Sequence, residues 1–290
     1  MATTNSLSTK TYRDKLRAAQ IMQALKNQVV AEKICLVDRT DAKIISSPYI
    51  TAMTTVVQAA TGTYTPANVT TTDDTLTVAD EFIIGAQIKG FESILANFDL
   101  FFAANQAMTN SVVQAVDKWV LNNLCEDGTG ALTTPAGGFT TASNVVGIVA
   151  SVISKCAGYA DALGGMYIVV ENTDLTGIIP AVASSGFRYA DDALMNGIYG
   201  QILGVDIYVV RSGTFVDEAT SSVSGTKTWT NAGHRVGGVK NVSTYAFPRG
   251  IQFEEKGVTG VTGKEVVVYG LVGFKQWTPT ATLTIDITLA

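Results

Sequence analysis

Residues 92–126 read ESILANFDLFFAANQAMTNSVVQAVDKWVLNNLCE and contain neither proline nor glycine. Apolar residues recur along this stretch at helical spacing: Ile94, Phe98, Phe101, Met108, Val112, Val116 and Trp119, with Leu95, Phe102 and Leu124 widening the stripe. Asn105 interrupts the stripe, and most polar residues, Asp117 among them, fall off it. The pattern predicts one helix about 50 Å long, ended by Asp127 and Gly128. It is either an ordinary core helix or the spine of an elongated subunit.

The composition indicates a β-rich chain that other subunits cover. Of the 290 residues 47% are hydrophobic, enough for a large core, whereas only 16% are charged. A surface so poor in charge favours burial against other copies. The net charge of -5 argues against a dedicated nucleic-acid-binding protein, which would carry a basic face.

Cysteine usage and the N-terminal residues indicate where the protein is made. Cys35, Cys125 and Cys156 lack metal-ligand spacing, so we expect buried or free thiols in a reducing compartment. The N-terminal sequence MATTNSLSTK lacks the apolar core of a signal peptide, and no apolar run is long enough to cross a bilayer. We therefore expect synthesis in a cytoplasm and no membrane partner.

The N-terminal region combines a helical pattern with basic charge. Residues 12–33 show apolar residues near helical spacing and are predicted to form a helix. Arg13 and Arg17 belong to a group of six basic residues in this region, and the rest of the chain is correspondingly more acidic. Such an arm is either a solvated face, a contact to a neighbouring subunit, or a surface that approaches a packaged polyanion.

Apolar residues on both sides of the polar run 65–75 predict a long β-hairpin, with Val56 and Val57 before the run and Leu76 and Val78 after it. The middle of this hairpin has almost nothing to bury, and an isolated two-stranded hairpin is marginal in water. We therefore expect a partner surface on another subunit. The candidate contact residues are Tyr64, Asn68, Thr71, Asp73 and Asp74, together with Arg13 and Arg17.

The rest of the chain alternates between strands and helices. We predict helices over residues 142–163 and from the capping residues 172–174 to about Ser184, and buried strands over 166–170 and 205–210. Residues 211–238 are rich in Ser, Thr and Gly and are predicted to form an exposed insertion. Three β segments end the chain, at residues 245–254, 265–277 and 280–289.

No residue pattern predicts catalysis, a metal site or a cofactor. His234 is the only histidine and is expected on a surface loop. Residues 257–264, GVTGVTGK, resemble a phosphate loop, but Val258 replaces its first glycine and Glu265 its magnesium-binding hydroxyl. We interpret this run as a hairpin turn. The acidic doublets at residues 73–74, 80–81 and 191–192 lack the spacing of a calcium loop.

The order of the predicted elements resembles a known family. The order is basic arm, long hairpin, long helix, α/β region with an insertion, and returning β segments. Residues 166–182 (MYIVVENTDLTGIIPAV), 197–210 (GIYGQILGVDIYVV) and 263–287 (GKEVVVYGLVGFKQWTPTATLTIDI) carry the local resemblance. The chain is similar to the major capsid proteins of tailed double-stranded DNA bacteriophages, which have the α+β Hong Kong 97 fold.

The resemblance implies five regions. They are an N-terminal arm over residues 1–50 that reaches over a neighbour, an extended loop (the β-hairpin) with the start of the peripheral domain over 51–91, the spine helix of the peripheral domain over 92–128, an axial domain over 129–245, and returning β segments of the peripheral domain over 246–290.

The same resemblance implies a structural function. The protein would self-assemble through pentamers and hexamers into an icosahedral capsid, in the host cytoplasm, and become part of the virion. Its partners would be other copies, a portal, packaged DNA contacted non-specifically on the inner face, and a separate scaffolding protein, because too few residues precede the hairpin to hold one. Three alternatives remain: the shell of an encapsulin-type bacterial nanocompartment, a soluble α/β enzyme, and another phage structural protein such as a tail component, which the long helix disfavours.

Overall fold

The computed structural model describes residues 29–50, 69–89, 100–156, 158–159, 163–184, 198–219, 227–257 and 263–290. The chain forms two compact units. Unit 1 comprises Met1–Lys26, Ile83–Val112 and Ile251–Tyr269, and unit 2 comprises Asn27–Phe82, Val113–Gly250 and Gly270–Ala290. Each unit is described by itself.

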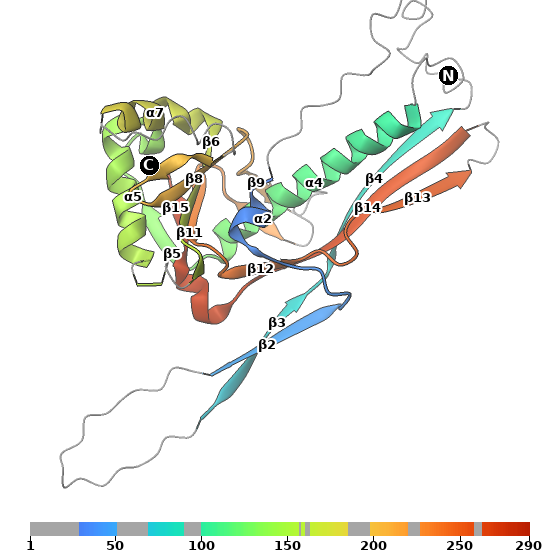
Figure 1. The fold of residues 1–290 in the computed structure, drawn as a ribbon, viewed down its shortest axis with the longest axis horizontal. Helices are drawn as coiled ribbons and strands as arrows, with labels where there is room; N and C mark the ends of the chain where they lie inside the picture. The colour runs from blue at the N-terminus through green and yellow to red at the C-terminus, as the bar shows by residue number, and fades with distance from the viewer. Residues whose placement is uncertain are drawn as a thin grey trace, which may run out of the picture. The chain divides into compact units, whose positions relative to one another are not determined.

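Unit 2 is built on a six-stranded mixed sheet (Figure 1). Its strand order is β5 (Gly130–Thr133), β15 (Thr284–Thr288), β11 (His234–Val239), β6 (Met166–Glu171), β8 (Val205–Val210) and β7 (Ile198–Ile202). The pairs β15–β5 and β6–β8 are parallel, whereas β11–β15, β11–β6 and β7–β8 are antiparallel. The strands expected at residues 166–170 and 205–210 are confirmed as β6 and β8. Their continuous apolar runs are typical of strands that are buried on both faces.

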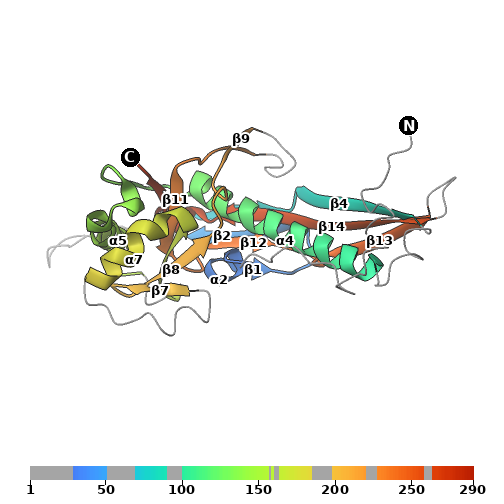
Figure 2. The same ribbon diagram turned by 90° about the horizontal axis from the view of Figure 1, so that it is seen from above.

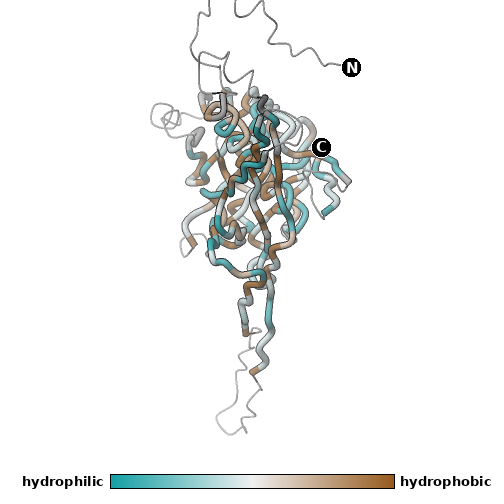
Figure 3. Tube along the Cα trace, turned by 90° about the vertical axis from the view of Figure 1, so that its right-hand side faces the viewer, coloured by the Kyte–Doolittle hydropathy of each residue, from teal (hydrophilic) through white to brown (hydrophobic). Residues whose placement is uncertain are grey.

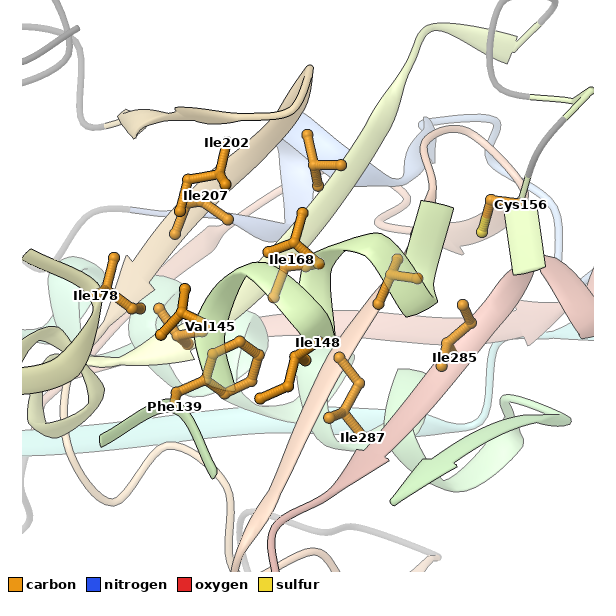
Figure 4. Close-up of a cluster of buried hydrophobic side chains, with 14 of the residues drawn as sticks. Phe139, Val145, Ile148, Cys156, Ile168, Ile178, Ile202, Ile207, Ile285 and Ile287 are labelled. Carbon is orange, nitrogen blue, oxygen red and sulfur yellow. The ribbon is translucent and has the colours of Figure 1, made fainter. Parts of the chain in front are cut away.

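Two helices cover one face of this sheet, as Figures 1 and 2 show. They are α5 (Ala142–Cys156) and α7 (Leu175–Ser184), and η1 (Gly138–Thr140) and η2 (Asn172–Asp174) precede them. The core between the helices and the sheet is mostly aliphatic and includes the aromatic ring of Phe139. Phe139, Val145, Ile168 and Ile285 are fully buried (Figure 4). The helix that ends at Ser184 is confirmed. The single helix expected over residues 142–163 is interrupted after Cys156 by a turn at Gly158 and Tyr159.

The exposed insertion expected over residues 211–238 is wrong for its C-terminal part. β9 (Asp217–Ala219) pairs with β10 (Thr228–Thr230), and β11 is a central, buried strand of the six-stranded sheet. β11 was not predicted from the sequence because it contains Gly237 and Gly238, and glycine normally indicates a loop. In β11 close packing requires glycine at position 238. Its φ is 146°, and a Cβ there would lie 2.1 Å from the carbonyl oxygen of Leu283.

The long helix α4 (Leu100–Asp127) has 28 residues and ends where the sequence predicts. The predicted residues 92–99 lie outside the described part of the chain. Trp119 is 1% exposed and meets the rings of Phe82 and Phe274 edge-on. Phe102 departs from the predicted apolar stripe, because it is 59% exposed.

The expected β segment 245–254 is two strands. β12 (Ser243–Ala246) and β13 (Gln252–Gly257) are separated by a turn in which Arg249 and Gly250 have φ values of 57° and 62°. β13 pairs antiparallel with β14 (Gly263–Gln276), and β4 (Asp80–Lys89) also pairs with β14. Residues 263–269 of β14 and 83–89 of β4 belong to unit 1. Gly257 lies opposite Lys264. The run 257–264 therefore connects two antiparallel strands, as a hairpin turn does, whereas a phosphate loop leads from a strand into a helix.

At the start of unit 2, β1 (Leu36–Asp38) runs parallel to β12, and α2 (Ala31–Ile34) precedes it. The helix expected over residues 12–33 lies mostly outside the described residues, and Val29 and Val30 are not helical. The last β segment is β15 and lies in the six-stranded sheet, whereas the resemblance implied that it belongs with the other returning β segments. Its Ile285 and Ile287 complete the core under α5. None of the described helices is long and apolar enough to span a membrane.

Candidate functional site

The predicted hairpin is present as a two-stranded ribbon formed by β2 (Ile44–Ile50) and β3 (Thr71–Thr77). The strands are antiparallel, with Ile44 opposite Thr77 and Ile50 opposite Thr71. Figure 1 shows the ribbon projecting from the rest of unit 2, and Figure 3 shows hydrophobic residues along its strands. Its first strand begins earlier than Val56 and Val57, where the sequence placed it. Threonines in β3 fit the half-exposed pleated surface of a strand, so part of the polar run is strand as well.

The base of the ribbon is fixed to unit 2 by Asp74. Its Oδ2 accepts hydrogen bonds from the backbone N–H and the hydroxyl of Thr278, both at 2.8 Å, and its Oδ1 lies 2.7 Å from Nζ of Lys275. Burial opposes ionisation of this carboxyl, but the bonds from Lys275 and Thr278 outweigh it and hold the pKa of Asp74 below its usual value. Leu76, Val78 and Ala246 form a small core beside it, with Ile45 and Trp277 packed against it.

The opposite surface of the ribbon is open. Residues that face each other across antiparallel strands point to the same side, so two sets of side chains alternate along the ribbon. The set that faces away from Asp74, here named the open face, consists of Ile44, Ser46, Pro48, Ile50, Thr71, Asp73, Thr75 and Thr77, all exposed. Ile44 and Ile50 are 59% and 58% exposed, and Asp73 is the one charged side chain of the set. An isolated two-stranded ribbon with exposed isoleucines needs a partner surface.

The candidate contact residues fall into three groups in the structure. Thr71 and Asp73 lie together on the open face and remain predicted contacts. Asp74 is 7% exposed and bonded within its own subunit, so it fixes the ribbon instead. Tyr64, Asn68, Arg13 and Arg17 lie outside the described residues.

A buried ion cluster holds the segment that follows β8. Arg235, which is 5% exposed, donates from Nε to Asp174 at 2.6 Å, and its Nη2 lies 3.3 Å from Glu171. Oε1 of Glu171 accepts three successive backbone N–H groups, from residues Gly213, Thr214 and Phe215, at 3.0, 3.0 and 3.2 Å. Every charge in this cluster is used to position backbone, so its role is structural.

Two asparagines of α4 hold the same region from the other side, and the sequence did not indicate them. Asn122 donates to the carbonyl oxygen of Thr214 at 2.8 Å, and its Oδ1 accepts the N–H of Val216 at 3.2 Å. Asn123 accepts the indole N–H of Trp229 at 3.0 Å. Both asparagines are fully buried. Only their distant partners reveal this role, because polar residues in a helix are ordinarily expected at the surface.

His234 and the cysteines show no arrangement for catalysis. His234 begins β11, where its Nδ1 lies 2.8 Å from Asp286 of β15, so the expectation of a surface loop is wrong. Burial raises the pKa of the Cys35 thiol to about 12 and of the Cys156 thiol to about 11, and raises that of Cys125 well above its usual value. Thiols held in the protonated form are poor nucleophiles and poor metal ligands. No cluster of metal-binding side chains occurs within the described ranges.

Asp117 of α4 anchors the first described residues. Its Oδ1 accepts the backbone N–H groups of Val30 and Ala31 at 2.9 and 2.7 Å. Burial raises the pKa of this carboxyl to about 6, against the effect of those two hydrogen bonds and with a smaller contribution from Glu32. The sequence placed Asp117 off the apolar stripe, but it is 8% exposed, because residues 30–31 cover it.

A pocket of about 340 Å³ lies beside Asp117 in unit 2. α4 contributes Gln114, Ala115, Asp117 and Lys118, the segment after β8 contributes residues 210–214, and Val29 completes the lining. Lys118 and Arg211 give the pocket two cationic side chains.

Comparison with known proteins identifies the fold. No family model matches the chain, and no curated protein matches it. Solved structures do match. The capsid of cyanophage P-SCSP1u has a TM-score of 0.71 at 12% identity, over 94% of this chain and 91% of that chain. A structure from Mycobacterium phage Che8 has a TM-score of 0.69 at 18% identity, over 94% and 96%. The mature capsid of bacteriophage PhiM1 has a TM-score of 0.69 at 11% identity, over 93% and 90%. The expected α+β fold is confirmed: this chain has the Hong Kong 97-type fold of phage capsid subunits.

Proposed function

We propose that this chain is the major capsid protein of a tailed double-stranded DNA bacteriophage and self-assembles into an icosahedral shell. The observation that carries this function is the fold match, which extends over more than 90% of this chain and at least 90% of capsid chains from several phages. A match over whole chains is stronger support than a shared motif, although a fold alone does not determine function.

The geometry of the ribbon supports the proposal independently of the fold match. Its base is fixed by Asp74, so the strands are presented in a defined direction, while Ile44 and Ile50 of the open face remain exposed. A rigid surface with apolar groups and one charge is suited to bind another copy. We assign the ribbon to the extended loop, α4 to the spine helix, and the α/β part of residues 129–245 to the axial domain.

Assembly would proceed through many weak, repeated contacts. Each contact buries a modest area, and closure of the shell makes every later contact effectively intramolecular. We infer that the copies form pentamers and hexamers in the host cytoplasm, with a scaffolding protein and a portal as partners. The completed shell would enclose double-stranded DNA, contact it non-specifically on the inner face, and form the virion.

Shortening the ribbon tests this function. Replacement of residues 51–70 by Asn-Gly joins Ile50 to Thr71, which already face each other, through a two-residue hairpin turn. The matched control replaces residues 220–226, between β9 and β10, by Asn-Gly, which together with Lys227 leaves a three-residue turn between the paired residues Ala219 and Thr228.

The proposal predicts that the control assembles like the unmodified protein, as seen by sedimentation and electron microscopy. The ribbon variant should stay folded by circular dichroism but give few or no shells. Shells of normal yield from the ribbon variant would contradict a role of the ribbon in assembly, and absence of particles from all three proteins, even with a scaffolding protein, would contradict the proposed function.

A further inference from the structure

The pocket beside Asp117 contains two cations that form no ion pair with any carboxylate of the described residues. Lys118 of α4 and Arg211 after β8 both line it. Among the described residues, neither is joined to a carboxylate, whereas Lys227, Lys240, Arg235 and most other described cations are. Two cations against the single carboxylate of Asp117 leave this concave site with a net positive charge, which favours an anionic occupant.

The wall of this pocket is held in place before any occupant binds. Residues 213–215 donate three backbone N–H groups to Glu171, and Asn122 binds the backbone of Thr214 and Val216. A preformed wall lowers the entropic cost of binding. It also explains why Glu171, Asp174 and Arg235 are buried together, because their cluster fixes the segment that presents Arg211.

Asp117 limits which anion fits. Its carboxylate lines the same pocket, so a phosphate with two charges would meet more repulsion there than a carboxylate with one. A carboxylate on a protein surface is therefore the favoured occupant.

The open face of the ribbon supplies such a carboxylate. Asp73 is its single charged side chain, and it forms no ion pair with any cation of the described part of the chain. The threonines and isoleucines around it offer hydrogen bonds and apolar contact but no competing charge. The one charge on this face thus complements the pocket.

We propose that Asp73 of one copy binds Lys118 and Arg211 in the pocket of a second copy. The inference rests on the proposed self-assembly and names the surface that receives the ribbon. Because ribbon and pocket are different surfaces, each copy gives one contact and receives one. Such a head-to-tail arrangement forms closed rings when its rotation is five- or six-fold, which is the geometry that pentamers and hexamers require.

Crosslinking in assembled particles tests the contact. The double variant Asp73→Cys with Arg211→Cys is treated with a short bismaleimide and analysed on a denaturing gel. The three native cysteines are buried free thiols and give little background. The proposal predicts a ladder that extends beyond dimers, because each copy carries both halves of the contact. Each single variant should give no ladder, and neither should the matched pair Glu81→Cys with Arg211→Cys, in which an exposed carboxylate elsewhere is replaced.

A charge exchange provides the second test. Asp73→Lys should lower the yield of particles about tenfold, the effect of losing roughly 1.4 kcal/mol per contact, and Lys118→Asp with Arg211→Asp should do the same. Combining the three changes should restore the yield.

Three results would overturn the inference: particles of the double cysteine variant that give no ladder, normal yield from Asp73→Lys, or no rescue by the combination. If the unmodified chain forms particles in the same experiment, only the pairing fails. If it forms none, even with a scaffolding protein, the proposed function fails as well.

Discussion

Oδ1 of Asp117 accepts the backbone N–H of Ala31 at 2.7 Å, across 86 residues of sequence. This bond, with the one from Val30, fixes the first described residues onto α4. Burial makes the arrangement sensitive to pH, because ionisation of Asp117 must occur away from water.

The free energy of unfolding should therefore depend on the protonation of Asp117. Its pKa is about 6 in the folded protein and near the ordinary 3.8 when unfolded. Between these values the folded chain binds more protons at Asp117 than the unfolded chain, so the contribution of Asp117 to stability is fully present below pH 4 and is lost as the pH rises through 6. The total loss is ~3 kcal/mol. About 1.4 kcal/mol of this loss falls between pH 5 and pH 7.5, so urea denaturation at these two pH values should show a difference of that size, with Asp117→Asn as the control that cannot titrate. Equal pH dependence of both proteins would contradict this prediction.

Loss of Arg235 should strongly destabilise the protein. Arg235→Met leaves Glu171 and Asp174 buried without their cation, which costs about 3–5 kcal/mol. The control is Arg249→Met, because Arg249 pairs with Asp41 at the surface, where both side chains are more than half exposed. That change should cost less than about 1 kcal/mol. Denaturant unfolding of both variants checks the contrast, and similar losses would show that the buried cluster is not the stabilising feature.

Two glycine substitutions should have opposite effects. In Gly238→Ala the new methyl group collides with the carbonyl of Leu283 in the central sheet, so we expect insoluble or unfolded protein. In Gly147→Ala, on the exposed side of α5, nothing lies within 4 Å of the new Cβ. Alanine also has the higher helix propensity, so this variant should gain about 0.5–1 kcal/mol. Soluble yield checks the prediction for Gly238→Ala, and thermal unfolding checks the prediction for Gly147→Ala. A soluble, stable Gly238→Ala variant would contradict the packing of β11.

Adjacent aspartates should separate folding from assembly. Asp74→Ala leaves the backbone N–H of Thr278 and the ammonium of Lys275 without their acceptor and should cost about 2 kcal/mol in unfolding of the unassembled protein. Asp73→Ala removes an exposed side chain and should change that stability by less than about 0.5 kcal/mol. Particle yield should nevertheless fall for Asp73→Ala. A large loss of stability from Asp73→Ala would place it in the fold and not at a contact.

Periodicity made part of this fold predictable. The apolar spacing around Val112, Val116 and Trp119 predicted α4, and the continuous runs at residues 166–170 and 205–210 predicted β6 and β8. Each of these signals is local. The order of such elements was enough to predict the capsid fold, although no single motif was specific.

What the sequence missed depends on contacts between distant residues. β11 lacks an alternating pattern because two of its residues are glycines. They are required by Ile168 and Ile287 on the neighbouring strands and by Leu283, which directly precedes β15. Asp117 and Asn122 are polar residues of a helix, and only backbone groups 86 and 92 residues away turn them into buried anchors. The opposite roles of Asp73 and Asp74 follow from the two faces of a strand, which become distinct only when one face is covered.

The most direct test of the account is the mass of the purified chain expressed alone, measured by light scattering after size-exclusion chromatography and imaged by electron microscopy. The account predicts megadalton shells or tubes, or isolated pentamers and hexamers. If the chain needs a scaffolding protein, these assemblies should form once that protein is added. A monomer or small dimer that forms no larger assembly under either condition would contradict a shell-forming function.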